Sequence, residues 1–224
     1  MSSIYAERVS DSPFIQSVWH VRMESTGATI LPADSNWQLL VMKHNGKTSL
    51  CVGGPTTKAY SLPQTAGAEG FGIRFKLSAL MPQLPARTLV DAMTTLPDAT
   101  RTSFWLNDRM WPFPDPENTE TFVDWLVRDG LLVREPVVDA VLQDHSPAMS
   151  LRSVQRRFLQ VTGMTHRSVR QIERARQAAA LLCQGTPTLD AVYQAGYFDQ
   201  PHLTHALKRL IGTTPAQIND PELV

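Results

Sequence analysis

Arginine and glutamine side chains recur at helical spacing in the last third of the chain. Arg152, Gln155 and Arg156 stand three and four positions apart, which places them on one face of an α-helix. In the major groove of a duplex, arginine can hydrogen-bond the edge of guanine and glutamine the edge of adenine. The spacing therefore predicts a helix whose outer face is able to read DNA bases.

The residues around these side chains predict the helix that carries them. Apolar residues recur three or four positions apart on the opposite face, where they would contact a core: Leu151, Val154, Phe158 and Val161. Ser150 is a suitable N-cap because its hydroxyl can accept a free backbone N–H. Gly163 suits the left-handed conformation that ends many helices. We expect an amphipathic helix between Ser150 and Gly163.

A second stretch, residues 196–215, follows the same plan. Asp199 can cap a helix, Pro201 is tolerated in the first turn, and Gly212 would end it. The buried stripe is expected to consist of Leu203, Leu207, Leu210 and Ile211. The polar side chains left outside are Gln200, His202 and His205, followed by Lys208 and Arg209. A short helix and a sharp turn predicted at 189–197 would complete a helix-turn-helix.

A longer helix is predicted between the two stretches. Thr165 can cap it, and it can run to about Leu182, with an inner stripe of Val169, Ile172, Ala175, Ala179 and Leu182. About twenty residues at about 1.5 Å per residue give a spacer of about 30 Å. Because successive major grooves on one side of a duplex lie about 34 Å apart, this spacer would let both polar faces reach adjacent grooves.

The chain has no net charge, but its charged residues are unevenly distributed. Residues 1–145 carry 12 Lys or Arg against 16 Asp or Glu, a net charge of −4, and residues 146–224 carry 9 against 5, a net charge of +4. The run 151–172 contains five arginines and no acidic residue. A nucleic-acid reader attached to a separate domain would show this pattern, and so would a basic face that contacts only solvent.

The N-terminal half has the pattern of a β-rich region. Between residue 13 and about residue 77, short runs of β-branched and aromatic residues alternate with turn signals such as Asn45-Gly46. Five or six closely spaced strands favour a small antiparallel barrel or sandwich. Helical patterns follow at 118–128 and 137–142.

The predicted fold class is therefore α+β. We expect three parts: a β-rich domain at 1–100, a helical connector at 101–145, and an all-α double helix-turn-helix domain at 146–224.

The C-terminal motifs resemble the AraC/XylS family of bacterial transcription regulators over about residues 146–218. The resemblance rests on two half-motifs: Ser150, Gln155-Arg156-Arg157-Phe158 and Thr162-Gly163, then Gly196-Tyr197, Asp199, His202-Leu203, Lys208, Gly212 and Thr214-Pro215. It implies DNA base contacts from Arg152, Gln155, Arg156, Gln200, His202 and His205. Position 205 is usually arginine in this family, so the histidine there is expected to weaken a guanine or phosphate contact.

The resemblance also implies the role of the N-terminal region. That region is similar in outline to the effector-sensing, cupin-like β-barrels of such regulators. A small-molecule effector and RNA polymerase are therefore expected as partners besides double-stranded DNA, and the chain would act as a monomer or homodimer.

Other kinds of site have little support in the sequence. Cys51 and Cys183 are far apart and lack metal-type spacing, so neither a disulfide framework nor a zinc site is predicted, and both are expected to be small buried residues. His202 and His205 have no evident third metal ligand. No Gly-rich phosphate loop, nucleophile elbow or paired carboxylate emerges. We predict no enzyme activity, no metal and no cofactor.

The sequence also bears on the compartment. Its N-terminus lacks a basic region followed by an apolar run, and no apolar run approaches the length of about 18 residues that spans a bilayer. A cytoplasmic protein with no membrane partner is expected.

Two functional hypotheses follow from these patterns. In the first, the chain is a sequence-specific DNA-binding transcription regulator, with phosphate contacts from Arg157, Arg167, Arg170, Lys208 and Arg209. In the second, a small-molecule-binding or enzymatic β-barrel carries a helical module for oligomerisation or partner binding. The second hypothesis predicts a DNA affinity that depends steeply on salt but does not depend on sequence.

Overall fold

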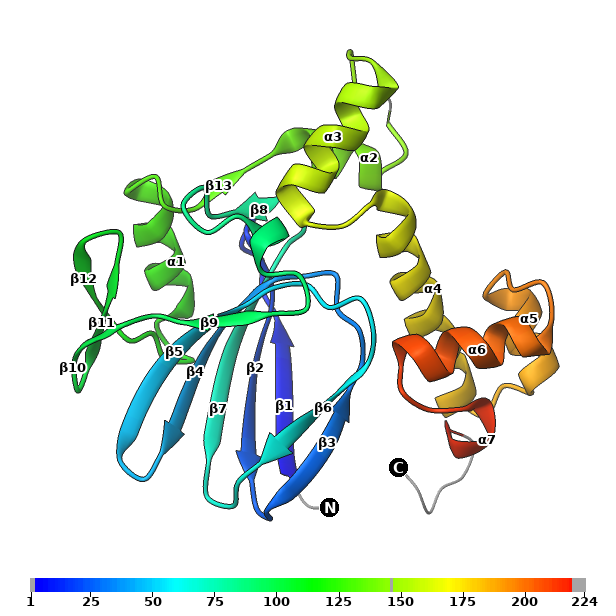
Figure 1. The fold of residues 1–224 in the computed structure, drawn as a ribbon, viewed down its shortest axis with the longest axis horizontal. Coiled ribbons are helices and arrows are strands. Elements are labelled where there is room, and N and C mark those ends of the chain that lie inside the picture. Colours follow the sequence, from blue (N-terminus) through cyan, green and yellow to red (C-terminus); the bar gives the residue numbers. More distant parts are fainter. Residues whose placement is uncertain (1–2, 146, 219–224) are drawn as a thin grey trace. The chain divides into compact units, whose positions relative to one another are not determined.

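The structure is a computed structural model that describes residues 3–145 and 147–218, so residue 146 and residues 219–224 of the predicted C-terminal domain lie outside the described residues. The chain divides into two compact units. The first consists of Met1–Gly27, Asn36–Pro55 and Pro63–Thr165, and the second of Ala28–Ser35, Thr56–Leu62 and His166–Val224. Figure 1 labels the helices and strands and colours them by their position in the sequence.

A six-stranded antiparallel sheet dominates the first unit. Its strand order is β1 (Ser3–Val9), β2 (Ile15–Met23), β7 (Glu69–Phe75), β4 (Gln38–His44), β5 (Lys47–Gly53) and β9 (Met93–Thr95). Asn45 and Gly46 connect β4 to β5 with φ angles of 49° and 72°. Positive φ at both central residues is typical of the tight hairpin turn predicted for this pair.

One apolar face of this sheet forms the core of the first unit. Ile15, Leu50, Ile73 and Phe75 have no exposed surface. Trp37 stacks on Phe75 with ring centroids 4.0 Å apart and planes 8° apart. In β4 the buried Leu39 and Val41 alternate with more exposed residues, as expected for a sheet with one buried face, whereas the end of β5 is a continuous buried run.

Residues 98–112 form a second, smaller sheet whose strands were not predicted. It comprises β10 (Asp98–Thr100), β11 (Ser103–Leu106) and β12 (Arg109–Pro112). Asn107 and Asp108 join β11 to β12 with φ angles of 52° and 58°. This pair is a hairpin signal of the same kind as Asn45-Gly46, but the strands beside it are only four residues long, too short for a clear alternation of polar and apolar residues.

The remaining elements of the first unit are short. They are β8 (Ala79–Leu80), which pairs with β13 (Val133–Arg134), the 3₁₀ helix η1 (Ala86–Thr88), and the helices α1 (Thr119–Arg128), α2 (Pro136–Leu142) and α3 (Leu151–Thr162). The helices predicted at 118–128 and 137–142 are confirmed. Phe122, Val123 and Leu126 of α1 are buried in the core of the sheet.

A carboxylate–guanidinium pair joins β1 to α1. Arg8 Nη1 and Nη2 donate to the two Glu120 oxygens at 2.7 and 3.0 Å, and Ser10 Oγ donates to Glu120 at 3.0 Å. The hydrogen bonds from Arg8 lower the pKa of Glu120 from 4.5 to about 2. Both side chains are nearly half exposed, so solvent screens part of this interaction.

Replacing Glu120 with glutamine is expected to lower the free energy of unfolding at neutral pH and to lose that effect in acid. Because the pKa of Glu120 is lower in the folded chain than in the unfolded chain, its charge stabilises the fold above pH 4.5. That stabilisation disappears as the pH falls from 4.5 towards about 2. Urea unfolding of both chains at a series of pH values measures the difference, and a constant difference would contradict the pairing.

The second unit is mainly helical. Its helices are α4 (His166–Cys183), α5 (Thr188–Gln194), α6 (Gln200–Leu210) and α7 (Pro215–Ile218). Their shared core is formed by Ala178, Leu182, Ala191, Val192, Ala195, Tyr197, Leu203 and Leu207. The buried stripe of α4 contains Ala178, whereas Ala179, the predicted member, is only half buried.

Two segments from the N-terminal half of the chain belong to this second unit. They contain most of β3 (Gly27–Leu31) and the start of β6 (Tyr60–Gln64), which pair with each other. The backbone N–H groups of Ala33 and Ala59 donate to the carbonyls of Leu210 and Arg209 at 2.7 and 2.9 Å. These bonds satisfy carbonyls of the last turn of α6, which have no partner within the helix.

Helix α4 contacts the same segments through one arginine. Arg176 Nε and Nη2 donate to the carbonyl of Ala33 at 3.1 and 2.9 Å, and Nη2 lies 3.3 Å from a carboxylate oxygen of Asp34. The two segments are also joined to each other, because the N–H of Thr56 donates to the Asp34 carbonyl at 2.7 Å and the N–H of Asp34 to Thr56 Oγ1 at 2.8 Å.

The predicted fold class is confirmed. Residues 4–112 are rich in β-strands, and the helices that follow include the two predicted polar-faced ones. Among the helices in the described part of the chain, none combines the length and apolar character that crossing a membrane would need.

Candidate nucleic-acid interface

Helix α3 has the ends that were predicted for it. Ser150 is extended, with φ −63° and ψ 147°, and its hydroxyl accepts the N–H of Ser153 at 3.3 Å. Gly163 has φ 72°, and its N–H donates to the carbonyl of Leu159 at 2.9 Å. A Cβ at Gly163 would lie 2.9 Å from Val90 Cγ2, so both its conformation and its surroundings favour glycine.

The apolar face of α3 begins one turn later than predicted. Val154, Phe158 and Val161 are buried, and α3 contacts η1, α2 and β8. The prediction that Leu151 faces the core is wrong, because 72 % of its surface is exposed. Leu151 is the first residue of the helix, before the turn at which α3 reaches its neighbours.

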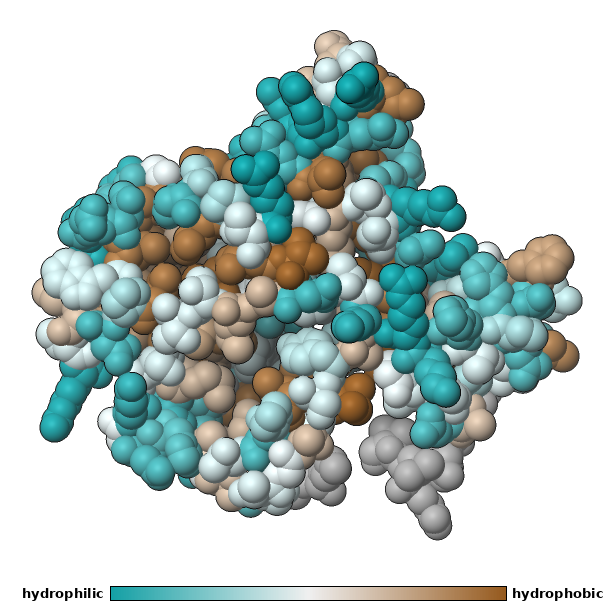
Figure 2. Space-filling model, viewed as in Figure 1, coloured by the Kyte–Doolittle hydropathy of each residue, from teal (hydrophilic) through white to brown (hydrophobic). Residues whose placement is uncertain are grey.

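The polar face of α3 is exposed along its length. Arg152, Gln155, Arg156 and Arg157 are all exposed, and hydrophilic side chains dominate the surface over α3 in Figure 2. Arg157 differs from the others because its Nε lies 3.8 Å from a carboxylate oxygen of Glu135, the N-cap of α2. The predicted base-reading residues are therefore accessible, and Arg157 points partly towards an acidic neighbour.

Helix α6 is also capped as predicted. Asp199 is extended, and its carboxylate accepts the N–H of His202 at 2.8 Å. Leu203, Leu207 and Leu210 are buried, whereas Ile211 is only half buried. The predicted contact residues Gln200, His202, His205, Lys208 and Arg209 are exposed.

Helix α5 and the turn after it position α6. Gly196 has φ 69°, and the N–H of Tyr197 donates to the carbonyl of Val192 at 2.8 Å. Val192 and Tyr197 are buried with Leu203 and Leu207 of α6. This arrangement of two short helices around a sharp turn and a shared core is a helix-turn-helix.

The cap of α6 gives a direct test of this geometry. Replacing Asp199 with alanine is expected to cost about 1 kcal/mol of stability, because the N–H of His202 would lose its acceptor. Asparagine at the same position is expected to restore most of that stability, since its side-chain oxygen can cap equally well. Chemical unfolding of the three chains measures both effects; equal losses in both variants would show that the carboxylate does not act as a cap.

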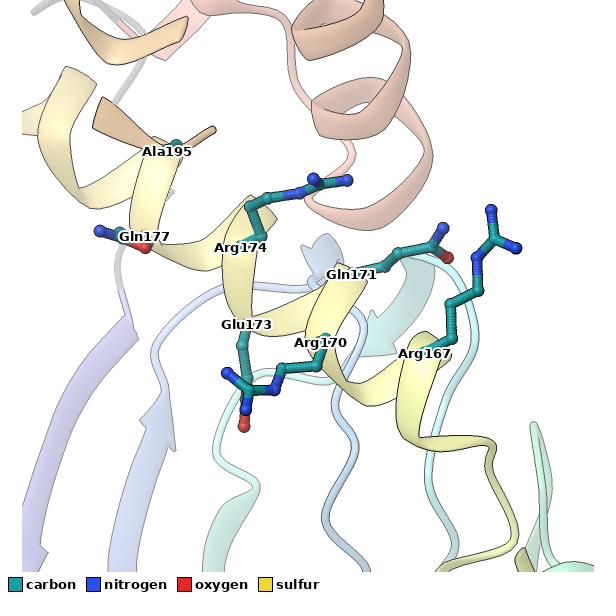
Figure 3. A pocket seen from close by; sticks show the side chains of 7 residues that line it. All are labelled: Arg167, Arg170, Gln171, Glu173, Arg174, Gln177 and Ala195. Carbon is teal, nitrogen blue, oxygen red and sulfur yellow. The ribbon is translucent and has the colours of Figure 1, made fainter. Parts of the chain in front are cut away.

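A basic surface follows the outer side of α4. A pocket of about 490 Å³ is lined chiefly by Arg167, Arg170, Gln171, Glu173, Arg174 and Gln177. Figure 3 shows Arg167, Gln171 and Arg174 projecting from one side of the helix, with Arg170 and Glu173 beside one another. The pocket brings together Arg167 and Arg170, two of the predicted phosphate-contacting residues.

A smaller pocket connects this surface to the second reading helix. It has a volume of about 80 Å³, shares Gln171 and Arg174 with the larger pocket, and is lined on the α6 side by His202, His205 and Arg209. The polar face of α6 and the basic face of α4 therefore form one surface of the second unit. Arg152, Gln155, Arg156 and Arg157 lie on α3 in the first unit.

Gln171 and Arg174 were missed as members of this surface. The signal was present, since residues 167, 170, 171 and 174 have the same three- and four-residue spacing that identified Arg152, Gln155 and Arg156. Only Arg167 and Arg170 of this face are predicted to contact DNA, because the helix is otherwise interpreted as a spacer.

The cysteines differ from each other in burial. Cys51 is buried, as predicted, and its Sγ lies 3.3 Å from Thr95 Oγ1. The prediction that Cys183 is buried is wrong, because it is exposed at the last position of α4. It follows the buried Leu182, and one residue along a helix turns a side chain by about 100° away from the buried stripe.

Comparison with known proteins adds one family match. Residues 147–220 match the family model described as a helix-turn-helix domain. The comparison with curated proteins gives no match.

Among solved structures, the chain is similar to ToxT from Vibrio cholerae. The P21 form is 10 % identical, with 95 % of this chain and 97 % of that chain covered and a TM-score of 0.40. ToxT from Vibrio cholerae O395 is 9 % identical, with 95 % and 96 % covered and a TM-score of 0.43.

The family match and the local geometry agree on the same part of the chain. The matched range contains both capped helices with exposed polar faces, and α5, the turn and α6 share one core. Residues 147–220 are a helix-turn-helix domain of the AraC type.

Proposed function

We propose that this chain is a sequence-specific DNA-binding transcription regulator whose helices α3 and α6 each read bases in a major groove. The observation that carries the proposal is the exposure of every predicted contact residue on two capped helices whose other faces are buried. The proposed base contacts come from Arg152, Gln155, Arg156, Gln200, His202 and His205.

The proposed phosphate contacts lie beside these faces. They come from Arg157 at α3, Arg167 and Arg170 at α4, and Lys208 and Arg209 at the end of α6. Such contacts fix the position of a protein on the duplex without reading its sequence. The pocket that contains Arg167 and Arg170 supports this role for α4.

Two further parts of the proposal concern regulation. The β-rich region is proposed to bind a small-molecule effector, as the corresponding regions do in the regulators that the C-terminal motifs resemble. RNA polymerase is the proposed protein partner, and the bacterial cytoplasm is the compartment in which such a regulator would act.

Selection from random duplexes with the full chain tests the central proposal. A reader of bases is expected to enrich a defined sequence and to bind it more tightly than a scrambled duplex of equal length at the same salt concentration. Enrichment of no sequence, with an affinity that depends only on salt, would support a generic basic surface instead.

A further inference from the structure

We infer that the pocket on α4 is a phosphate-binding site centred on Arg174, and that it holds one phosphodiester group of the DNA backbone next to the bases that α6 reads. This inference rests on the proposed function and extends it to a residue outside the predicted contact set. The pocket has a volume of about 490 Å³, and its charged lining consists of three arginines and one glutamate. An anion is the ligand that such a lining attracts.

Arg174 is held in position by its neighbours. Its Nη1 donates to the carbonyl of Gly196 at 3.3 Å, and its guanidinium lies 4.5 Å from the centre of the Tyr197 ring. Tyr197 is itself fixed in the core of the second unit, with only 5 % of its surface exposed. An arginine already fixed by stacking loses less conformational entropy when it binds an anion than a freely moving one does.

The hydrogen-bonding capacity of this pair is only partly used. Within the described residues, neither Arg174 Nε nor the Tyr197 hydroxyl makes a hydrogen bond of acceptable geometry. Burial raises the pKa of Tyr197, and the guanidinium of Arg174 opposes that rise. The tyrosine therefore keeps its proton at neutral pH and places no negative charge beside Arg174.

Tyr197 also links the site to the base-reading face. Its ring meets the ring of His202 edge-on, with centroids 5.1 Å apart and planes 84° apart. Arg174 lines both the α4 pocket and the smaller pocket beside His202 and His205. A phosphate held at Arg174 would thus set the position of the duplex relative to α6.

A purely structural role is the alternative for Arg174, because its bond to Gly196 joins α4 to the turn before α6. The two roles differ in their dependence on salt. Removing one contact between a basic side chain and a phosphate is expected to lower the steepness of log affinity against log salt concentration by about 0.9. If Arg174 only joined α4 to the turn, replacing it would change stability or sequence preference and would leave that slope unchanged.

The first experiment compares the full wild-type chain with Arg174→Ala on a selected duplex and on a scrambled one. We expect the variant to lose affinity for both duplexes by the same factor and to show the smaller salt slope. Glu173→Gln is the matched variant on the same helix, since it removes the one acidic side chain of the pocket. We expect it to bind both duplexes more tightly than the wild type, and an unchanged affinity would count against an anion site.

The second experiment identifies the phosphate. Single methylphosphonate groups, which carry no charge, replace the phosphates of the selected duplex one at a time. One position is expected to weaken binding of the wild type and to have no effect on Arg174→Ala. If every methylphosphonate position weakened binding equally in the wild type and in Arg174→Ala, the assignment would be overturned. If Arg174→Ala does not fold, Arg174→Gln serves as the variant, because it keeps a long side chain that can donate to the Gly196 carbonyl and loses the positive charge.

A third measurement shows whether the ligand of the pocket is a phosphodiester of DNA or free inorganic phosphate. Nuclear magnetic resonance of the arginine side chains, with inorganic phosphate added to the full chain, reports binding at Arg174 directly. Binding of inorganic phosphate without any methylphosphonate-sensitive position would overturn the assignment to DNA. If the wild type selects no sequence at all, the proposed function fails. If selection succeeds but the salt slope of Arg174→Ala is unchanged, only the present inference fails.

Discussion

Replacing Arg152 or Arg156 with alanine is expected to weaken binding to the preferred duplex by about 1–3 kcal/mol and to relax the choice of base at one half of the site. Both side chains are exposed on the outer face of α3. An arginine that forms two hydrogen bonds with guanine loses both when it is shortened, and the loss applies only to duplexes that carry the matching base. Binding to the selected duplex and to single-base variants of it measures the effect.

Arg157 provides the matched control for this prediction. It follows Arg156 directly, is exposed, and lies near the carboxylate of Glu135. As a proposed phosphate contact, Arg157→Ala is expected to lower affinity by a similar factor for every duplex and to leave base preference intact. If Arg152→Ala and Arg156→Ala also lowered affinity equally for every sequence, direct base reading by α3 would be ruled out.

The two reading helices are expected to contribute unequally. The outer face of α3 has arginines at 152 and 156, whereas α6 has Gln200, His202 and His205 and no arginine before Arg209. Because paired arginine–guanine contacts are among the strongest base contacts, α3 should supply most of the base-specific free energy. Gln200→Ala is therefore expected to broaden the selected sequence less than Arg152→Ala does.

The sequence predicts features that depend on local chemistry. Ser150, Gly163 and Asp199 take their predicted cap or stop positions, because capping involves only atoms within a few residues of one another. The hairpin turn at Asn45-Gly46 is predictable for the same reason, since it depends on which residues tolerate positive φ.

Features that depend on distant neighbours are not predictable in this way. Leu151 has the spacing of a core residue, but its burial depends on where α3 meets η1 and α2. The role of Arg174 depends on Tyr197, which is 23 positions further along the chain. Ala33 and Ala59 contact α6 through backbone N–H groups, which every residue except proline has, so no pattern of side chains marks these segments.

Gly212 follows the end of α6 and lies against the same two segments. Its φ is 88°, and its N–H donates to the carbonyl of Leu207 at 2.9 Å beyond the end of α6. A Cβ there would lie 2.4 Å from Ile30 Cγ2 and 3.1 Å from Ala59 Cβ. Gly212→Ala is therefore expected to be destabilising for two reasons, the left-handed backbone and the collision with the strand segments.

Gly185 separates these two costs, because it follows α4 with φ 82° and nothing lies within 4 Å of its missing Cβ. Gly185→Ala should cost only the backbone term, about 1–2 kcal/mol. Gly212→Ala should cost that amount and about 1–3 kcal/mol more, as overpacked sites do. Chemical unfolding of both variants measures the difference. If both variants lost the same free energy of unfolding, Ile30 and Ala59 would have moved aside without cost. The segments around β3 and β6 would then not fix the end of α6.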